Sequence, residues 1–123
     1  MNALGKHLLL ELNDCDRVIL NDIPALRDIL LAAAIDCGAT VLSDSFHQFN
    51  PCGVSGVVII AESHITIHTW PEHGYAAADI FTCGNTVVPE KAADVIIERL
   101  HAKTHAVVQV LRGTTESRQR VTS

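Results

Sequence analysis

The chain has 123 residues with a formal net charge of −5, and 48% of them are hydrophobic but only 4% aromatic. This length suits one domain with a largely aliphatic core, and the composition argues against intrinsic disorder. The one loose basic cluster, Arg118 and Arg120, lies near the end, so the sequence gives no indication of a basic surface that binds nucleic acid.

The first elements along the chain are a strand and a helix. In residues 5–12, three leucines alternate with other residues, which predicts a strand with one more apolar face. Asn21 or Asp22 can cap a helix, in which apolar residues then recur at helical spacing. Gly38 is placed to end that helix.

Four strands follow in close succession. Strands are predicted over residues 40–49 and 54–60, and the Asn-Pro-Cys-Gly sequence between them is typical of a turn. Two more are predicted over residues 64–70 and 75–81, and the four residues that separate them suit a hairpin loop.

The end of the chain completes the pattern β-α-β-β-β-β-α-β. Pro89 opens a second helix, residues 106–111 form a last strand, and residues 114–123 make a polar tail. Short connections favour a mainly antiparallel sheet, and two helices can cover one of its faces. The predicted fold class is therefore an α+β two-layer sandwich. A second copy of the chain could cover the other sheet face.

The sequence gives little indication of a membrane segment or of a redox site. No apolar stretch reaches membrane-spanning length and no basic-then-apolar leader opens the chain, so we expect a cytoplasmic protein without a membrane partner. The four cysteines contain no C-x-x-C pair, which argues against a zinc ribbon or a dithiol redox site. Cys15 and Cys37 are expected to be small buried hydrophobes, whereas Cys52 falls in a turn.

Residues 61–84, AESHITIHTWPEHGYAAADIFTCG, concentrate the reactive side chains: one serine, three histidines, two glutamates, an aspartate and a cysteine. This run resembles the prokaryotic, pyruvoyl-dependent S-adenosylmethionine decarboxylases. The flanking sequences GKHLLLEL, at residues 5–12, and SFHQFNPCGVSGVVIIAESH, at residues 45–64, resemble them too. The likeness covers residues 5–112 without a large gap and leaves only the tail unmatched.

The resemblance implies a single domain, residues 1–123, that cuts itself between Glu62 and Ser63. The products are a β chain, 1–62, and an α chain, 63–123, which begins with a covalently bound pyruvoyl group made from Ser63. That group forms a Schiff base with the amine of S-adenosylmethionine and supports its decarboxylation, which supplies the aminopropyl donor for spermidine biosynthesis. The processed chains are expected to pair as a dimer of α/β units with active sites near the interface.

Cutting requires the Ser63 hydroxyl to attack the carbonyl of Glu62 and turn an amide into an ester, which elimination then breaks. A base or proton shuttle near neutral pH is needed, and histidine has a suitable pKa. The resemblance gives that role to His68, with Ser55 assisting. Ser63 and His68 are five residues apart, so a regular strand would point them to opposite faces. A bend at Ser63 or a neighbouring strand must resolve this.

The resemblance makes Cys83 the proton donor to the α-carbon of the substrate after carbon dioxide leaves. A thiol suits this role because it is mostly protonated at neutral pH yet able to give up its proton. Phe49 and Trp70 are candidates to stack on adenine, and Glu72 could accept hydrogen bonds from the ribose or lie near the sulfonium.

Other interpretations of the same residues remain open. Glu11 and Asp79 are weaker ligand candidates, with structural carboxylates the simpler interpretation. The histidines and Cys83 could be taken for a zinc site, but their strand-like spacing does not favour one, and we expect no metal. An alternative function is pyruvoyl-dependent decarboxylation of ornithine or arginine, and a second is an uncleaved dimeric module that binds a small molecule.

Overall fold

The computed structural model describes residues 3–114 and contains the predicted order of strands and helices. The elements are β1 (Gly5–Asn13), α1 (Ile23–Asp36), β2 (Thr40–Gln48), β3 (Val54–Ala61), β4 (Ser63–Trp70), β5 (Tyr75–Cys83), α2 (Pro89–Arg99) and β6 (Thr104–Arg112). Two short 3-10 helices, η1 (Ile19–Asn21) and η2 (Pro71–His73), were not predicted from the sequence. The polar tail beyond residue 114 lies outside the described residues.

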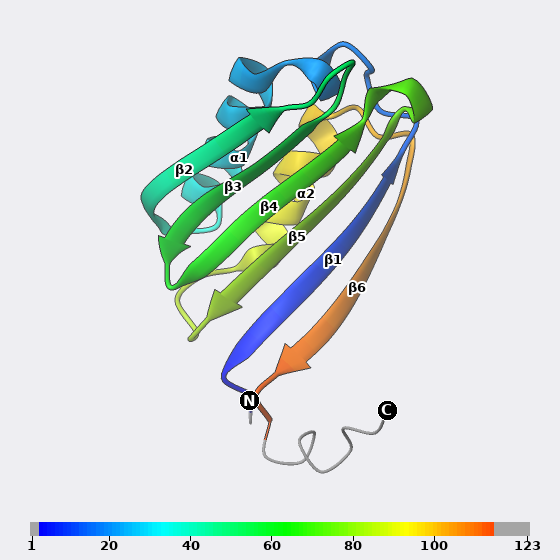
Figure 1. The fold of residues 1–123 in the computed structure, drawn as a ribbon. Helices are drawn as coiled ribbons and strands as arrows, with labels where there is room; N and C mark the ends of the chain where they lie inside the picture. Colours follow the sequence, from blue (N-terminus) through cyan, green and yellow to red (C-terminus); the bar gives the residue numbers. More distant parts are fainter. Residues whose placement is uncertain (1–2, 115–123) are drawn as a thin grey trace, which may run out of the picture.

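The six strands form one antiparallel sheet in the order β2-β3-β4-β5-β1-β6. Figure 1 shows α1 and α2 lying side by side behind this sheet, so both helices cover the same face. The predicted two-layer α+β sandwich is confirmed. Strand β1 lies between β5 and β6, which brings the start of the described chain next to its end.

The buried core lies between the helices and one face of the sheet. The predicted leucines of β1 and the apolar stripe of α1 are all buried there. The α1 helix begins as expected, because the Asp22 carboxylate accepts a hydrogen bond from the Ala25 amide at 3.2 Å. Strand β5 runs two residues past its predicted end, since Thr82 and Cys83 still pair with β1.

The other sheet face is not covered by any part of residues 3–114. Leu9 of β1 is 40% exposed, Ile59 of β3 is 43% exposed and Val108 of β6 is 54% exposed. These side chains alternate with buried neighbours on β1 and β3, which places them away from the helices. We call this surface the open face. No helix in the described part of the chain is long and apolar enough to span a membrane.

The core position of Leu30 in α1 can be tested directly. Leu30 is fully buried, whereas Leu42 in β2 is 62% exposed. In a Ser63→Ala background, which should keep the chain in one piece if it is cut at Ser63 as expected, Leu30→Ala should lower the free energy of unfolding by about 3 kcal/mol. Leu42→Ala, the control, should lower it by less than about 1 kcal/mol. Urea unfolding at equal protein concentration measures both, and equal effects would contradict this packing.

Candidate active site

Ser63 begins β4 directly after the tight turn that follows β3, and its backbone is strained. Its φ angle is 136°, in a region that favours glycine over other residues. Holding a serine there costs about 1–3 kcal/mol, which the surrounding sheet must offset. Of the two solutions left open by the sequence, a bend at Ser63 or a neighbouring strand, the bend is present, at the residue expected to be modified.

The Ser63 hydroxyl lies against Cys83. Ser63 Oγ and Cys83 Sγ are 3.4 Å apart, and both side chains are partly buried. Cys83 is the last residue of β5, on the strand that pairs with β4, while Ser63 itself pairs with Thr82. The two residues to which the resemblance gives the pyruvoyl group and the proton donor therefore lie next to each other in one chain.

Ser55 and His68 form a second pair. They face each other across β3 and β4, with Ser55 Oγ 2.8 Å from His68 Nδ1. His68 is exposed on the open face, because its strand neighbours Ile67 and Thr69 are buried. Shallow hollows of about 250 and 270 Å³ flank the pair, and both are lined by Thr66 and His68. The hydroxyl and imidazole are thus mutually oriented and accessible.

The two pairs are separated within one chain. His68 lies five positions after Ser63 along β4, which at the usual rise of a strand corresponds to about 16 Å. That distance is far beyond hydrogen-bond reach. His68 and Ser55 therefore lie too far away to act on Ser63 of the same chain in this conformation.

The three proposed substrate contacts lie at the His68 end of the sheet. Phe49 is 47% exposed and its ring centroid is 4.7 Å from that of His47. Trp70 is 41% exposed and lies 5.3 Å from the ring of Tyr75. Glu72 belongs to η2, immediately after Trp70. In a single chain, none of these three side chains is close enough to Ser63 to contact it.

The cysteines divide as the sequence predicted. Cys15 and Cys37 are buried. Burial and the nearby Asp14 raise the pKa of Cys15 to about 11, and burial also raises the pKa of Cys37. Cys52 lies 3.7 Å from a carboxylate oxygen of Glu72, and partial desolvation together with this carboxylate raises its pKa. These thiols stay protonated at neutral pH, which makes them poor nucleophiles.

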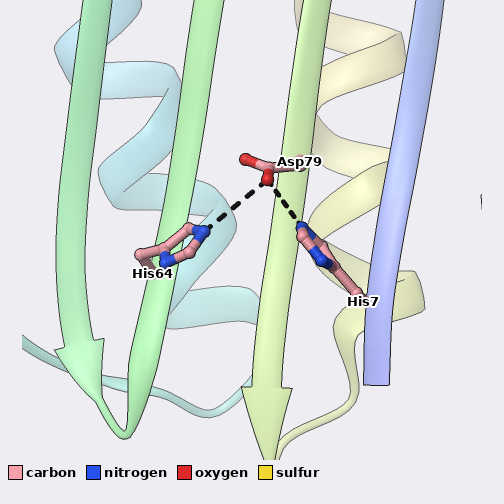
Figure 2. Close-up of side chains that lie close together, drawn as sticks. All are labelled: His7, His64 and Asp79. Atoms are coloured by element: carbon pink, nitrogen blue, oxygen red, sulfur yellow. Dashed lines mark hydrogen bonds and ion pairs between the residues drawn. The ribbon is translucent and has the colours of Figure 1, made fainter. Parts of the chain in front are cut away.

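A polar cluster on the open face was underestimated from the sequence. Asp79 of β5 lies between two histidines, with Oδ2 2.6 Å from His7 Nε2 and 3.6 Å from His64 Nε2, as Figure 2 shows. The Thr66 hydroxyl donates a hydrogen bond to the other carboxylate oxygen, and Arg112 Nη1 lies 3.0 Å from His7 Nδ1. The available signal was the position of His7 in β1, where it alternates with the buried leucines and so faces outward with Leu9.

This cluster contains the one group of three potential metal ligands found in residues 3–114, namely His7, His64 and Asp79, whose ligand atoms lie within 4.8 Å of one another. Arg112 opposes metal binding there. A guanidinium only donates hydrogen bonds, so His7 Nδ1 must accept and Nε2 must carry the hydrogen that points at Asp79. His7 therefore offers no free lone pair to a metal. The residues considered for zinc from the sequence alone, His68 and Cys83 among them, do not assemble.

Comparisons with known proteins agree with this architecture. The model of the S-adenosylmethionine decarboxylase family matches residues 6–113. The chain thus has the fold of a small α+β enzyme, and it belongs to the S-adenosylmethionine decarboxylase family.

Individual relatives cover nearly the whole chain. A protein of Thermodesulfovibrio yellowstonii named S-adenosylmethionine decarboxylase proenzyme is 55% identical over 113 residues, which are 92% of this chain and 84% of its own. A proenzyme of the same name from Caldanaerobacter subterraneus is 53% identical over 116 residues, 94% of each chain. The crystal structure of the adenosylmethionine decarboxylase from Aquifex aeolicus superposes with a TM-score of 0.87 at 38% identity, covering 94% of this chain and 96% of that one.

The strain at Ser63 predicts an unusual order of stabilities. Ser63→Gly should give a more stable uncut chain than Ser63→Ala, by about 1 kcal/mol, because glycine accepts the 136° φ angle without a steric penalty. Ser45, an exposed residue of β2 whose φ is not positive, serves as the control. There glycine should be less stable than alanine by about 0.5–1 kcal/mol. If urea midpoints rank the Ser63 variants like the Ser45 variants, Ser63 is not strained.

Proposed function

We propose that this protein decarboxylates S-adenosylmethionine with a pyruvoyl group that it makes from its own Ser63. The observation that carries the proposal is the 3.4 Å contact between Ser63 Oγ and Cys83 Sγ at a residue whose backbone is strained. Family membership supports the same reaction. The product chains would be 1–62 and 63–123 of a single domain, and we expect a cytoplasmic enzyme.

Processing begins with the strained serine. Attack of Ser63 Oγ on the Glu62 carbonyl replaces the peptide bond by an ester, so the backbone at residue 63 is released from its unfavourable conformation. Removal of the Ser63 α-proton then expels the Glu62 carboxylate, and hydrolysis of the remaining residue yields ammonia and the pyruvoyl end. Each step needs a proton acceptor or donor, and the oriented Ser55–His68 pair is suited to that task.

The pyruvoyl group supplies a ketone that can hold the substrate amine and withdraw electrons from its α-carbon. We assign the role of proton donor to Cys83, and the position of its sulfur beside the side chain of residue 63 supports this assignment. In this role the thiol gives its proton to the substrate α-carbon after carbon dioxide leaves. The partly buried setting at the end of β5 limits competition from water.

We infer that a second copy of the chain completes the site. The separation of about 16 Å along β4 keeps His68 away from Ser63 of its own chain. The open face carries exposed apolar side chains, including Leu9 and Ile59, and a twin subunit would bury them. We therefore infer a dimer in which Ser55 and His68 of one chain face Ser63 and Cys83 of the other. Phe49, Trp70 and Glu72, at the same end as His68, would reach the substrate from that second chain too.

Two exposed aromatic side chains favour the nucleoside substrate over a free basic amino acid. Phe49 and Trp70 can stack on an adenine ring, and ornithine and arginine have no aromatic ring to receive that contact. Glu72 can attract the sulfonium charge or accept hydrogen bonds from the ribose. The alternative of an uncleaved binding module does not account for the contact between Ser63 and Cys83.

Complementation between chains tests the cross-subunit arrangement. A Ser63→Ala chain keeps Ser55 and His68, and a His68→Ala chain keeps Ser63. Neither should be cut alone, but co-expression with different tags should yield cut His68→Ala chains, because the other subunit supplies the imidazole. Denaturing mass spectrometry identifies the pieces.

The control for this experiment replaces the helper chain by one that carries both Ser63→Ala and His68→Ala, which should restore nothing. If the wild-type chain cuts itself but the mixed pair does not, processing takes place within one chain. If the wild-type chain is never cut at Ser63, the proposed function itself is wrong.

The stacking role of Phe49 predicts a change in substrate affinity. Phe49→Ala should raise KM for S-adenosylmethionine about tenfold, since stacking of a base on an aromatic side chain is worth about 1–3 kcal/mol. The control, Val18→Ala, removes an apolar side chain that is 78% exposed at the edge of η1 and should leave KM unchanged. Release of carbon dioxide measures both. Faster turnover of ornithine or arginine than of the nucleoside would instead support the alternative substrate.

A further inference from the structure

Four neighbouring strands contribute side chains to one continuous polar cluster on the open face. It consists of Arg112 on β6, His7 on β1, Asp79 on β5, and His64 and Thr66 on β4, and we call it the Asp79 cluster. Asp79 is its centre, because it receives a hydrogen bond from Thr66 and another from His7 and lies 3.6 Å from His64 Nε2. Neither the substrate contacts nor the processing pair accounts for this cluster.

The hydrogen bonds in the cluster have a fixed direction. Arg112 donates to His7 Nδ1, and His7 therefore donates through Nε2 to Asp79. Burial disfavours the charged form of Asp79, but the hydrogen bonds from Thr66 and His7 and the nearby imidazoles outweigh it and lower its pKa. Asp79 thus stays a carboxylate at neutral pH and attracts the imidazole of His64.

The cluster is in contact with the surroundings of Cys83. The ring of Phe81 lies on β5 between Asp79 and Cys83, with its centroid 5.8 Å from that of His64 and 5.1 Å from that of His7. A Cβ atom added to Gly5, the β1 partner of Cys83, would come within 2.5 Å of the Phe81 ring. The ring therefore fills the space above Gly5 and links the Asp79 cluster to the end of β5.

Chain cutting changes what holds residue 63 in place. In the uncut chain, residue 63 is tied covalently to the turn after β3. Once the bond to Glu62 is broken, residue 63 is a free end, held by strand pairing and by the side chains of the residues that follow it. Among the first four residues of β4, His64 and Thr66 both contact Asp79. The next anchor after the cut is thus the Asp79 carboxylate.

We propose that Asp79 is a positioning residue that holds the new end of β4, through His64 and Thr66, so that residue 63 stays against Cys83 after the cut. This inference rests on the proposed function and adds to it a determinant of proton placement. Asp79 itself lies two same-face positions from Cys83 and acts through its partners on β4. Arg112 and His7 hold Asp79 in turn from the opposite side.

The position of residue 63 decides where a proton goes. In productive turnover the proton reaches the substrate α-carbon, which has kept the electron pair of the broken bond to carbon dioxide. If the proton instead reaches the former ketone carbon of residue 63, the electron pair is transferred to that carbon. Hydrolysis with one water then leaves alanine with a free amino group at residue 63 and releases the substrate carbon as an aldehyde. Loose placement of residue 63 should increase this inactivating error.

The test compares Asp79→Asn with Asp94→Asn, the same change at an exposed residue of α2. Processed protein of each kind is given S-adenosylmethionine, and kcat, KM and the fraction of 63–123 chains with N-terminal alanine are measured. For Asp79→Asn we expect kcat to fall about tenfold with KM within a factor of about two, since small displacements of reacting groups are costly. The alanine fraction per turnover should rise several-fold. Asp94→Asn should match the wild type.

Three results would overturn the proposal. One is an unchanged kcat and alanine fraction in Asp79→Asn. Another is a lower kcat with an unchanged alanine fraction per turnover, which would indicate a merely structural role. If Asp79→Asn does not fold, the same test is made with His64→Gln, whose side chain is 35% exposed. The third result that would overturn the proposal is then an alanine fraction in His64→Gln equal to that of the wild type. Failure of the wild-type chain to be cut or to release carbon dioxide would instead refute the proposed function.

Discussion

The register of β4 between β3 and β5 is the constraint on which the candidate site depends. It places Ser55 opposite His68 on one side and Thr66 opposite Asp79 on the other. A shift of one residue would turn His68 and Thr66 toward the helices and bring Ile65 and Ile67 into the open. Because the buried isoleucines oppose such a shift, the core between sheet and helices fixes the geometry of the reactive side chains.

The same alternation explains why one face of the sheet is uncovered in a single chain. Residues that face α1 and α2 form an aliphatic core, whereas the open face mixes histidines and carboxylates with exposed Leu9 and Ile59. A purely solvated face would not need those apolar residues, and a purely structural interface would not need the polar ones. The combination fits a surface that joins two subunits and at the same time lines a site between them.

Much of the fold could be predicted from the sequence, because the alternation in β1 and β4 and the caps of α1 are local signals. The insertion of β1 between β5 and β6 could not, since strand order depends on contacts between distant segments. The family resemblance singled out the residues of the Ser63–Cys83 and Ser55–His68 pairs, and the five-residue spacing correctly indicated that Ser63 and His68 would not share a face of a regular strand. The structure resolves this in two ways: the backbone bends at Ser63, and the two pairs remain apart in one chain. The Asp79 cluster was missed because each member alone is an ordinary polar residue on a strand.

In the proposed mechanism, residue 63 faces opposite demands before and after the cut. The uncut chain needs a backbone there that gains from losing its peptide bond, and a φ of 136° at a serine supplies that. The cut chain needs the same residue to be held firmly, because the fate of a single proton depends on its distance from Cys83. One residue cannot meet both demands through its own conformation. The proposed cut breaks the peptide bond that defines the strained φ angle of Ser63, whereas the contacts of His64 and Thr66 with Asp79 follow residue 63 in the chain and would survive the cut.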